Sequence, residues 1–109
     1  MIEEKVEIVP LSVNKVWQGR RFKTKTYKDY EKYLLSILPK YDTPVGELHI
    51  ELEYGFSSKL SDIDNPCKPL LDVLCKKYGF DDRQIVVLNQ VKKIVKKGKE
   101  YLKFKINEL

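Results

Sequence analysis

The segment ELHIELEYGF, residues 47–56, alternates strictly between apolar and polar side chains. In an extended chain one face carries Leu48, Ile50, Leu52, Tyr54 and Phe56, and the other carries His49, Glu51 and Glu53. A period of two residues is typical of a β-strand that buries one face against a core. This segment is the clearest strand signal in the chain. We expect His49, the only histidine, to be a surface residue without a catalytic role.

Downstream of this strand the sequence predicts a helix that begins near Asp64 or Asn65, with Pro66 close to its first position. The apolar face of this helix consists of Leu71, Leu74 and Tyr78. Gly79 is the expected C-terminal stop, because glycine adopts the left-handed backbone that ends many helices. Pro69 lacks a backbone donor, so the first turn is expected to be irregular.

Three further strands complete the predicted sheet. Residues 84–95 and 101–106 read as strands, and Lys96–Lys99 is expected to join them as a hairpin turn exposed to solvent. At the start of the chain, charged and apolar residues alternate over residues 5–8, which predicts a first strand that Pro10 ends.

Between the first strand and the strand at residues 47–56 lie a basic segment and a helix. Residues 11–25 show no clean period and are expected to form a long basic loop, a kind of segment that is usually functional or disordered. A helix is predicted to begin at Thr26, with Asp29 in a variant of the capping box, and to stop at Pro39. Its apolar face consists of Tyr27, Tyr30, Leu34, Ile37 and Leu38.

The order of elements is therefore β-loop-α-β-α-β-β. This order predicts an α/β fold in which two main helices pack on a single mixed sheet. The chain has 109 residues, of which 42% are hydrophobic, and this length suits one domain over residues 1–109 with one core. Lys and Arg number 21 against 16 Asp and Glu, and the net charge of +5 favours a polyanionic partner.

The cysteines and the lengths of the apolar runs indicate in which cellular compartment we expect the protein. Cys67 and Cys75 are eight residues apart in one predicted helix, about 12 Å by the helical rise, which is too far for a disulfide. We expect both to be reduced and partly buried. The N-terminus has no signal-peptide pattern and no apolar run has transmembrane length, so we expect a soluble, cytoplasmic protein without membrane contact.

Acidic residues gather at two places that flank the second predicted helix. Asp62 and Asp64 are two residues apart, so in an extended stretch both carboxylates project from one side, with Ile63 facing the core. Together with Asp81 or Asp82 they would provide the carboxylates that Mg²⁺ needs for phosphodiester hydrolysis. Lys68 lies one helical turn after Asp64 and could reach the same site.

A purely structural interpretation accounts for the same residues. Paired aspartates at the junction between a strand and a helix are often turn or cap residues, and Asp64 could cap the helix. Asp64, Lys68 and Asp72 are spaced so that they could form an ordinary row of ion pairs along the helix surface. From spacing alone, these residues could form a metal site or could have only structural roles as cap, turn and ion-pair residues.

The wider pattern resembles a known family. The run Asp62-x-Asp64-Asn65-x-x-Lys68-x-x-x-Asp72-x-Leu74, followed by Gly79-Phe80-Asp81-Asp82-x-x-Ile85, resembles the RusA-type Holliday junction resolvases of phages and prophages. An early strand that ends at Pro10, Ser12 and Asn14 in a basic loop, and a closing β-hairpin also look like this family. The likeness covers most of the chain, although only the segment from Asp62 to Ile85 is specific.

The resemblance implies an activity and its residues. It implies a site for Mg²⁺, or Mn²⁺ in its place, made by Asp62, Asp64 and Asp82, with Asp81 as second choice for the third ligand. It also implies that Lys68 is catalytically important. The family's enzymes are homodimers that nick opposed strands of a four-way DNA junction symmetrically, and a two-fold dimer suits such a substrate. A bacterial cytoplasm and a phage or prophage origin would follow.

The basic segment is the predicted DNA-binding surface. The candidates are Asn14, Lys15, Trp17, Arg20, Arg21, Lys23, Lys25 and, near the aspartates, Lys59. Basic side chains would contact phosphates, and Trp17 could stack on an unpaired base. Trp17 could equally anchor the loop on the core, and Phe22 is expected to do so.

Three other functions remain open from the sequence. The chain could bind branched DNA without cutting it, or cut forks, flaps or RNA rather than four-way junctions. It could also be a structural domain whose aspartates only cap a helix.

Overall fold

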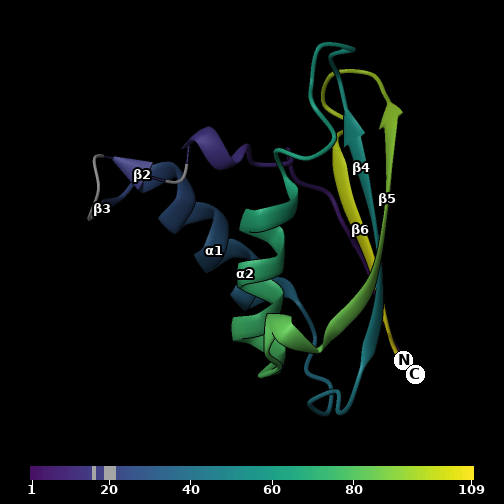
Figure 1. Ribbon diagram of the computed structural model, residues 1–109. Coiled ribbons are helices and arrows are strands. Elements are labelled where there is room, and N and C mark those ends of the chain that lie inside the picture. Colours follow the sequence, from purple (N-terminus) through teal and green to yellow (C-terminus); the bar gives the residue numbers. More distant parts are fainter. Residues whose placement is uncertain (16, 19–21) are drawn as a thin grey trace.

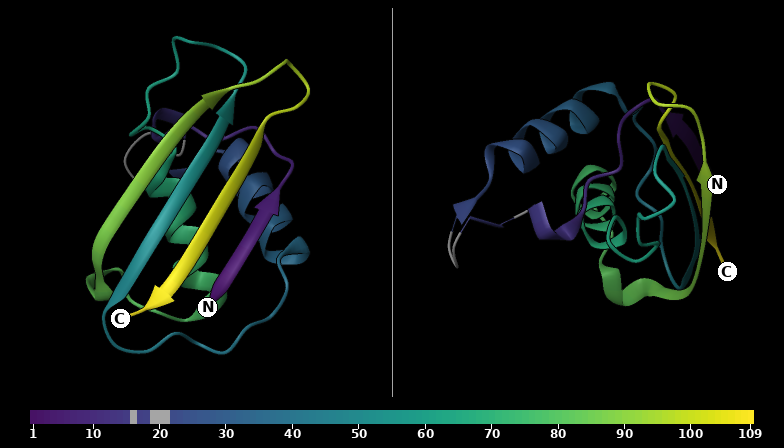
Figure 2. Two further views of the ribbon diagram at one scale, coloured as in Figure 1. Left: turned by 90° about the vertical axis from the view of Figure 1, so that its right-hand side faces the viewer. Right: turned by 90° about the horizontal axis from the view of Figure 1, so that it is seen from above.

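The computed structural model describes residues 1–15, 17–18 and 22–109. A four-stranded sheet carries two helices, α1 (Lys25–Ile37) and α2 (Cys67–Tyr78), and both lie on one of its faces (Figure 1). Seen from above in Figure 2, both helices lie on the same side and the opposite face of the sheet is uncovered by any helix. The predicted α/β class, with one mixed sheet packed by two helices, is confirmed.

The sheet contains both parallel and antiparallel neighbours. Its strands are β1 (Ile2–Val6), β4 (Leu48–Phe56), β5 (Ile85–Ile94) and β6 (Tyr101–Glu108), in the order β1-β6-β4-β5. β6 runs antiparallel to both β1 and β4, whereas β5 runs parallel to β4. A parallel pair needs a crossover, and α2 provides it between β4 and β5.

The strand predicted over residues 47–56 is confirmed in position and orientation. Leu48, Ile50, Leu52 and Tyr54 are at most 2% exposed and face the helices, while Glu51 is exposed on the other side. The predicted surface position of His49 needs a small correction, because its side chain is half-buried and its Nε2 lies 2.6 Å from Asn89 Oδ1 on β5.

The expected hairpin between residues 84–95 and 101–106 is wrong. Both strands exist, but β4 lies between them and hydrogen-bonds to each, so residues 96–99 cross the end of β4 instead of turning back on β5. The Val95 N–H donates to the Phe56 carbonyl, at 2.7 Å, where this crossing begins. The physical reason is that β4 has the most apolar face, and a strand so buried on that face is best placed in the middle of a sheet.

The first helix begins slightly earlier than predicted. The N-cap of α1 is Thr24, whose hydroxyl accepts a hydrogen bond from the Tyr27 N–H at 3.1 Å, so the capping box expected at Thr26 and Asp29 is wrong. Asp29 instead pairs with Lys25, at 3.4 Å. The predicted apolar face is buried except for Ile37, which lies at the helix end and is 49% exposed.

The second helix begins later than predicted. Residues 63–66 form turns, and α2 starts only at Cys67. A helix that began at Asp64 or Asn65 would need a backbone hydrogen bond from residue 69, which Pro69 cannot donate, whereas a start at Cys67 places Pro69 in the first turn, where no such bond is required. Gly79 ends the helix in the left-handed conformation, with φ 73°, as expected. Cys67 and Cys75 are half-buried free thiols.

The N-terminal part also differs from the predicted boundaries. β1 ends at Val6, so Ile8 packs against the core outside any strand. The expected long loop contains a 3₁₀ turn, η1 (Val13–Lys15), and a short ribbon of β2 (Trp17–Gln18) and β3 (Phe22–Lys23). Within the described residues, no helix is long and apolar enough to cross a membrane.

Candidate functional site

The loop between β4 and α2 carries the first pair of candidate aspartates. Asp62 and Asp64 are both exposed, and Ile63 between them is 39% exposed, so the expectation that Ile63 faces the core is wrong. Asp62 Oδ2 accepts a hydrogen bond from the Asn65 side-chain amide at 3.4 Å. The stretch bends into turns at residue 63, which explains why it does not keep the alternation of an extended chain.

The structural role foreseen for Asp64 is not the one observed. The N-cap position of α2 is Pro66, and no side chain caps this helix end. Asp64 contacts the start of α2 through its backbone carbonyl, which accepts a hydrogen bond from the Cys67 N–H at 3.4 Å. The carboxylate of Asp64 is therefore not used as a helix cap and faces solvent beside the start of α2.

The second pair of aspartates lies after α2, and its two members have different surroundings. Asp81 caps the short helix η2 (Asp82–Gln84): its carboxylate accepts from the Arg83 N–H at 2.9 Å and pairs with the Arg83 guanidinium at 3.1 Å. These contacts with Arg83 lower the pKa of Asp81 to about 2. Asp82 instead faces α2 and lies 4.0 Å from Lys68 Nζ.

Lys68 connects Asp82 to the helix. Its Nζ lies 2.9 Å from Asp72 Oδ1, one helical turn along α2. Of the row of ion pairs expected from spacing, the pair of Lys68 with Asp72 is therefore present. The hydrogen bond to Asp72, followed by the charges of Asp72 and Asp82, raises the pKa of Lys68. The pairs are exposed, so their contribution to stability is small, typically about 0–1 kcal/mol.

The two aspartate pairs lie at opposite ends of α2. The charge of Asp64 acts on the Cys67 thiol at the beginning of the helix, whereas Asp82 acts on Cys75. These cysteines are eight residues apart, which corresponds to about 12 Å along a helix. In the part of the chain that the structure describes, no three His, Cys, Asp or Glu side chains are grouped so that they could hold a metal ion. One chain alone therefore does not bring Asp82 to Asp62 and Asp64.

A small pocket of about 220 Å³ lies beside Asp62. Its polar lining includes Asn65 and the hydroxyl-bearing residues Ser12, Ser57, Ser58 and Ser61. The Val13 N–H donates to the Asn65 carbonyl at 2.8 Å, which ties the beginning of the basic segment to the aspartate loop. Lys92 of β5 donates from Nζ to the Ser61 carbonyl at 2.7 Å, a contact that sequence reasoning missed because the two residues are 31 apart in the chain.

The predicted DNA-binding residues have varied surroundings. Asn14 and Lys15 are exposed in η1, and Lys59 is exposed in the loop before Asp62. Lys25 pairs with Asp29, and the Lys23 ammonium lies 4.5 Å from the centre of the Tyr27 ring.

Three further DNA-binding predictions involve residues whose side chains are not described. Trp17 lies in β2, but its side chain falls outside the described part, as does that of Phe22. Arg20 and Arg21 lie wholly outside the described residues. The two readings of Trp17 therefore remain predictions.

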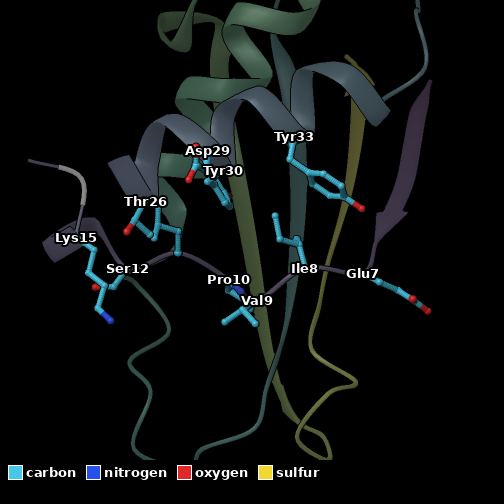
Figure 3. A pocket seen from close by; sticks show the side chains of 11 residues that line it. Glu7, Ile8, Val9, Pro10, Ser12, Lys15, Thr26, Asp29, Tyr30 and Tyr33 are labelled. Carbon is cyan, nitrogen blue, oxygen red and sulfur yellow. The ribbon is translucent and has the colours of Figure 1, made fainter. Parts of the chain in front are cut away.

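A hollow of about 580 Å³ lies away from the aspartates. Figure 3 shows it between the segment Glu7–Lys15 and α1, with Ile8 and Val9 on one side and Tyr30 and Tyr33 on the other. The hydroxyl of Tyr30 is buried without a hydrogen-bond partner among the described atoms, and burial raises its pKa well above the usual range. Its lining is mainly apolar, and its two carboxylates, Glu7 and Asp29, do not belong to any three-ligand group among the described residues, so we place the candidate site at the aspartates.

Comparison with known proteins leaves the family open. No protein-family model matches the chain, and no curated protein matches it.

Proposed function

We propose that this protein is a Mg²⁺-dependent endonuclease that resolves four-way DNA junctions by paired symmetric nicks, as the RusA-type enzymes do. The observation that carries the proposal is the pattern Asp62-x-Asp64-Asn65-x-x-Lys68 followed by Asp81-Asp82 at the end of the next helix. Phage or prophage origin, a bacterial cytoplasm and a role in recombination or repair belong to the same proposal.

The surroundings of the acidic residues support this choice. Asp62 and Asp64 are exposed carboxylates without a capping role, and hard oxygen donors of this kind suit Mg²⁺ or Mn²⁺. Asp81 is engaged by Arg83, which leaves Asp82 as the third ligand that we favour. When bound, the metal would activate water and stabilise charge on the phosphate.

The remaining residues would bind and orient the DNA. Lys68 is held by Asp72, so its ammonium is positioned to contact a phosphate near Asp82. Lys15 and Asn14 lie on a turn that is bonded to the aspartate loop, so a strand bound there would pass close to Asp62. Lys59 would contact the backbone on the other side of that loop.

The test is cleavage of a synthetic four-way junction with Mg²⁺ or Mn²⁺. We expect symmetric nicks from the wild type and a loss of at least about a hundredfold in rate for Asp62→Asn, Asp64→Asn and Asp82→Asn, because each removes a metal ligand. Asp42→Asn, an exposed substitution outside the site, is the matched control. A wild-type protein that leaves junctions intact with both metals would refute the proposal, and so would nicking that Asp62→Asn does not slow.

The alternative is a protein that binds branched DNA without cutting it. It rests on the exposed lysines Lys15 and Lys59, which would contact phosphates whether or not a metal binds. Tight junction binding in EDTA, with no cleavage of junctions, forks or flaps by any divalent metal, would support this alternative over the nuclease.

A further inference from the structure

The side chains of β5 are arranged against the usual pattern of burial. In a sheet that helices cover on one face, the covered residues are normally apolar. Five apolar side chains of β5 are instead between 38% and 48% exposed: Val86, Val87, Leu88, Val91 and Ile94. After Ile85, the half-buried side chains of this strand are the polar ones, Gln90 and Lys92. Burial of apolar surface therefore does not explain why these two residues face inwards.

Both polar residues point to the face of the sheet that the helices cover. Gln90 is registered with Leu52, and Lys92 with Tyr54. These two residues of β4 are at most 2% exposed and face the helices, and registered residues of neighbouring strands point to the same face. Polar groups in such a place are expected to have hydrogen-bond partners, and each of them has one.

The partner of Lys92 belongs to the loop that carries the candidate aspartates. Lys92 Nζ donates to the Ser61 carbonyl at 2.7 Å, and Ser61 immediately precedes Asp62. Figure 2 shows this loop at the end of β5, on the side of the helices. A peptide unit is planar, so the Ser61 carbonyl and the Asp62 Cα belong to one rigid group. A hydrogen bond that fixes this carbonyl also fixes the point from which the Asp62 side chain leaves the backbone.

The loop gains little order from its own contacts. The Leu60 and Ser61 N–H groups bond to Ser58, and the Asn65 amide bonds to Asp62, so these hydrogen bonds stay within the loop. Leu60 is 91% exposed, so burial of its side chain does not hold the loop either. Lys92 provides the link to the sheet that these local contacts do not supply.

Gln90 acts on the other end of the same segment. The Tyr54 hydroxyl donates to Gln90 Oε1 at 2.5 Å, and the same hydroxyl is hydrogen-bonded to the Cys67 thiol. Cys67 is the first residue of α2, directly after the aspartate loop. The two inward polar residues of β5 thus hold the stretch with Asp62 and Asp64 at its beginning and behind its end.

The neighbouring lysine shows what an ordinary surface lysine of this strand does. Lys93 points to the uncovered face, is 59% exposed, and lies 3.6 Å from the Glu53 carboxylate. Lys92 differs because it is half-buried and its ammonium meets a backbone carbonyl of a distant loop. The two residues carry the same charge, so a comparison between them separates the effect of charge from the effect of this contact.

We propose that Lys92 is a positioning residue of the candidate nuclease site: by holding the Ser61 carbonyl, it keeps the carboxylates of Asp62 and Asp64 in the arrangement that binds the metal. This inference rests on the proposed function for the identity of the site. Lys92 acts through the loop and touches neither the metal nor the scissile phosphate. Removing groups that orient metal ligands typically costs about 10- to 100-fold in metal affinity or activity.

Lys92→Met tests the proposal, because it keeps most of the side-chain volume and removes the donor. We expect the affinity of the full chain for Mn²⁺, measured by calorimetry, to fall about 10- to 100-fold. The rate of junction cleavage should fall by a similar factor at limiting Mn²⁺ and recover at saturating Mn²⁺, since all carboxylates are still present. The affinity for a junction in EDTA should change only as much as it does in Lys93→Met, the matched control.

Two further variants separate the hydrogen bond from polarity and from folding. Lys92→Arg keeps a long side chain with donors, so it should stay within a few-fold of wild type. Lys92→Gln is polar but shorter, so it should lose as much as Lys92→Met. Circular dichroism and urea denaturation verify that each variant is folded. If Lys92→Met does not fold, the difference between Lys92→Arg and Lys92→Gln decides.

The outcomes distinguish this inference from the proposed function. If the wild type cuts junctions and folded Lys92→Met matches Lys93→Met in Mn²⁺ affinity and rate, the positioning role is overturned and the nuclease stands. A loss of rate that saturating Mn²⁺ does not relieve, at unchanged Mn²⁺ affinity, also overturns it, because Lys92 would then act on the DNA. If the wild type binds Mn²⁺ but cuts nothing, the nuclease is refuted and the Mn²⁺ affinities alone decide about Lys92. A wild type that binds no Mn²⁺ overturns both.

Discussion

Asp81 and Asp82 are adjacent residues with different environments, and each can be tested by the same conservative change. Asp81→Asn weakens the cap of η2 and the pair with Arg83, whereas Asp82→Asn removes the carboxylate that faces Lys68. We expect Asp82→Asn to lose cleavage by at least about a hundredfold and Asp81→Asn to stay within a few-fold of wild type. Initial nicking rates decide this, and the opposite ranking would exchange the roles of the two residues.

The thiol of Cys75 reports on the position of Asp82. Burial, and then the nearby charge of Asp82, raise the pKa of Cys75 to about 11, so the unreactive thiol predominates at neutral pH. In a Cys67→Ser background, alkylation should be slow at pH 8 and become faster as the pH rises towards 11. Asp82→Asn removes a charge that opposes ionisation, so it should lower this pKa and speed the reaction at pH 9.

The matched control for this experiment is Asp62→Asn, which lies at the other end of α2 and should leave the Cys75 profile unchanged. If Asp62→Asn shifted the alkylation profile as much as Asp82→Asn does, the separation of the two aspartate pairs would be wrong.

At the scale of single residues, the sequence predicted which side chains belong to the candidate site better than it predicted their contacts. The pattern identified Asp62, Asp64, Lys68 and the Asp81-Asp82 pair, but spacing could not show which aspartate of the pair is a cap. That depends on Arg83, whose guanidinium contacts Asp81 across the short 3₁₀ turn. The contact of Lys92 with Ser61 joins residues 31 apart, and no local pattern encodes it.

Within β4, Gly55 leaves room for a neighbouring ring. A Cβ at this position would lie 2.3 Å from two atoms of the Tyr101 ring, which is 7% exposed and held by a hydrogen bond to Glu53 at 2.5 Å and by Lys5. Gly55→Ala should destabilise the protein by about 1–3 kcal/mol, because the ring has little room to move.

Urea denaturation measures this loss of stability, and Tyr101→Ala provides the control background. Without the ring, the added methyl group of Gly55→Ala meets no obstacle, so its cost should fall close to zero. A cost that is the same in both backgrounds would show that crowding by the ring is not the cause.

At the scale of elements, the alternation of β4 was read correctly from sequence, because burial imposes a period that the strand carries by itself. The apolar face of α2 was read only in part: Leu74 and Tyr78 are buried as predicted and Leu71 is partly buried, but the prediction left out the buried Leu70 and Val73. The neighbours of β5 and β6 were predicted wrongly, because these two strands were expected to pair with each other. Adjacent strands joined by a short basic segment usually form a hairpin, and the sequence contains nothing local that reveals β4 between them. The parallel crossover through α2 decides the order, and it involves residues from Leu48 to Ile94.

For the molecule as a whole, the net charge of +5 predicts salt-dependent binding of junctions. If six of the proposed basic residues contact phosphates, the logarithm of affinity should fall with the logarithm of salt concentration with a slope of about −5. Lys59→Gln should reduce the slope by about one, because this exposed lysine is expected to contact DNA.

Titrations of a labelled junction in EDTA at several salt concentrations measure these slopes. Lys40→Gln, an exposed lysine beyond the end of α1, is the matched control and should leave the slope unchanged. A wild-type slope near zero would remove the basis for phosphate contacts.

The general architecture followed from sequence because the number, type and order of the main elements are set by patterns within each element. The spatial separation of the two aspartate pairs could not be predicted in that way. Their separation depends on β4 and β5 being parallel, which places the ends of α2 at opposite ends of the sheet. Only the complete topology contains this information.

The place of β6 also governs how the chain can reach its folded state. β1 pairs only with β6, in a register that joins Ile2 to Ile106, so the first strand made has no neighbour until about a hundred further residues have been added. This separation raises the entropic cost of adding β1 to the sheet, whereas β4, α2 and β5 lie within residues 48–94 and can pack together without it. We therefore expect β1 to join the sheet late, and this last long-range pairing to slow folding.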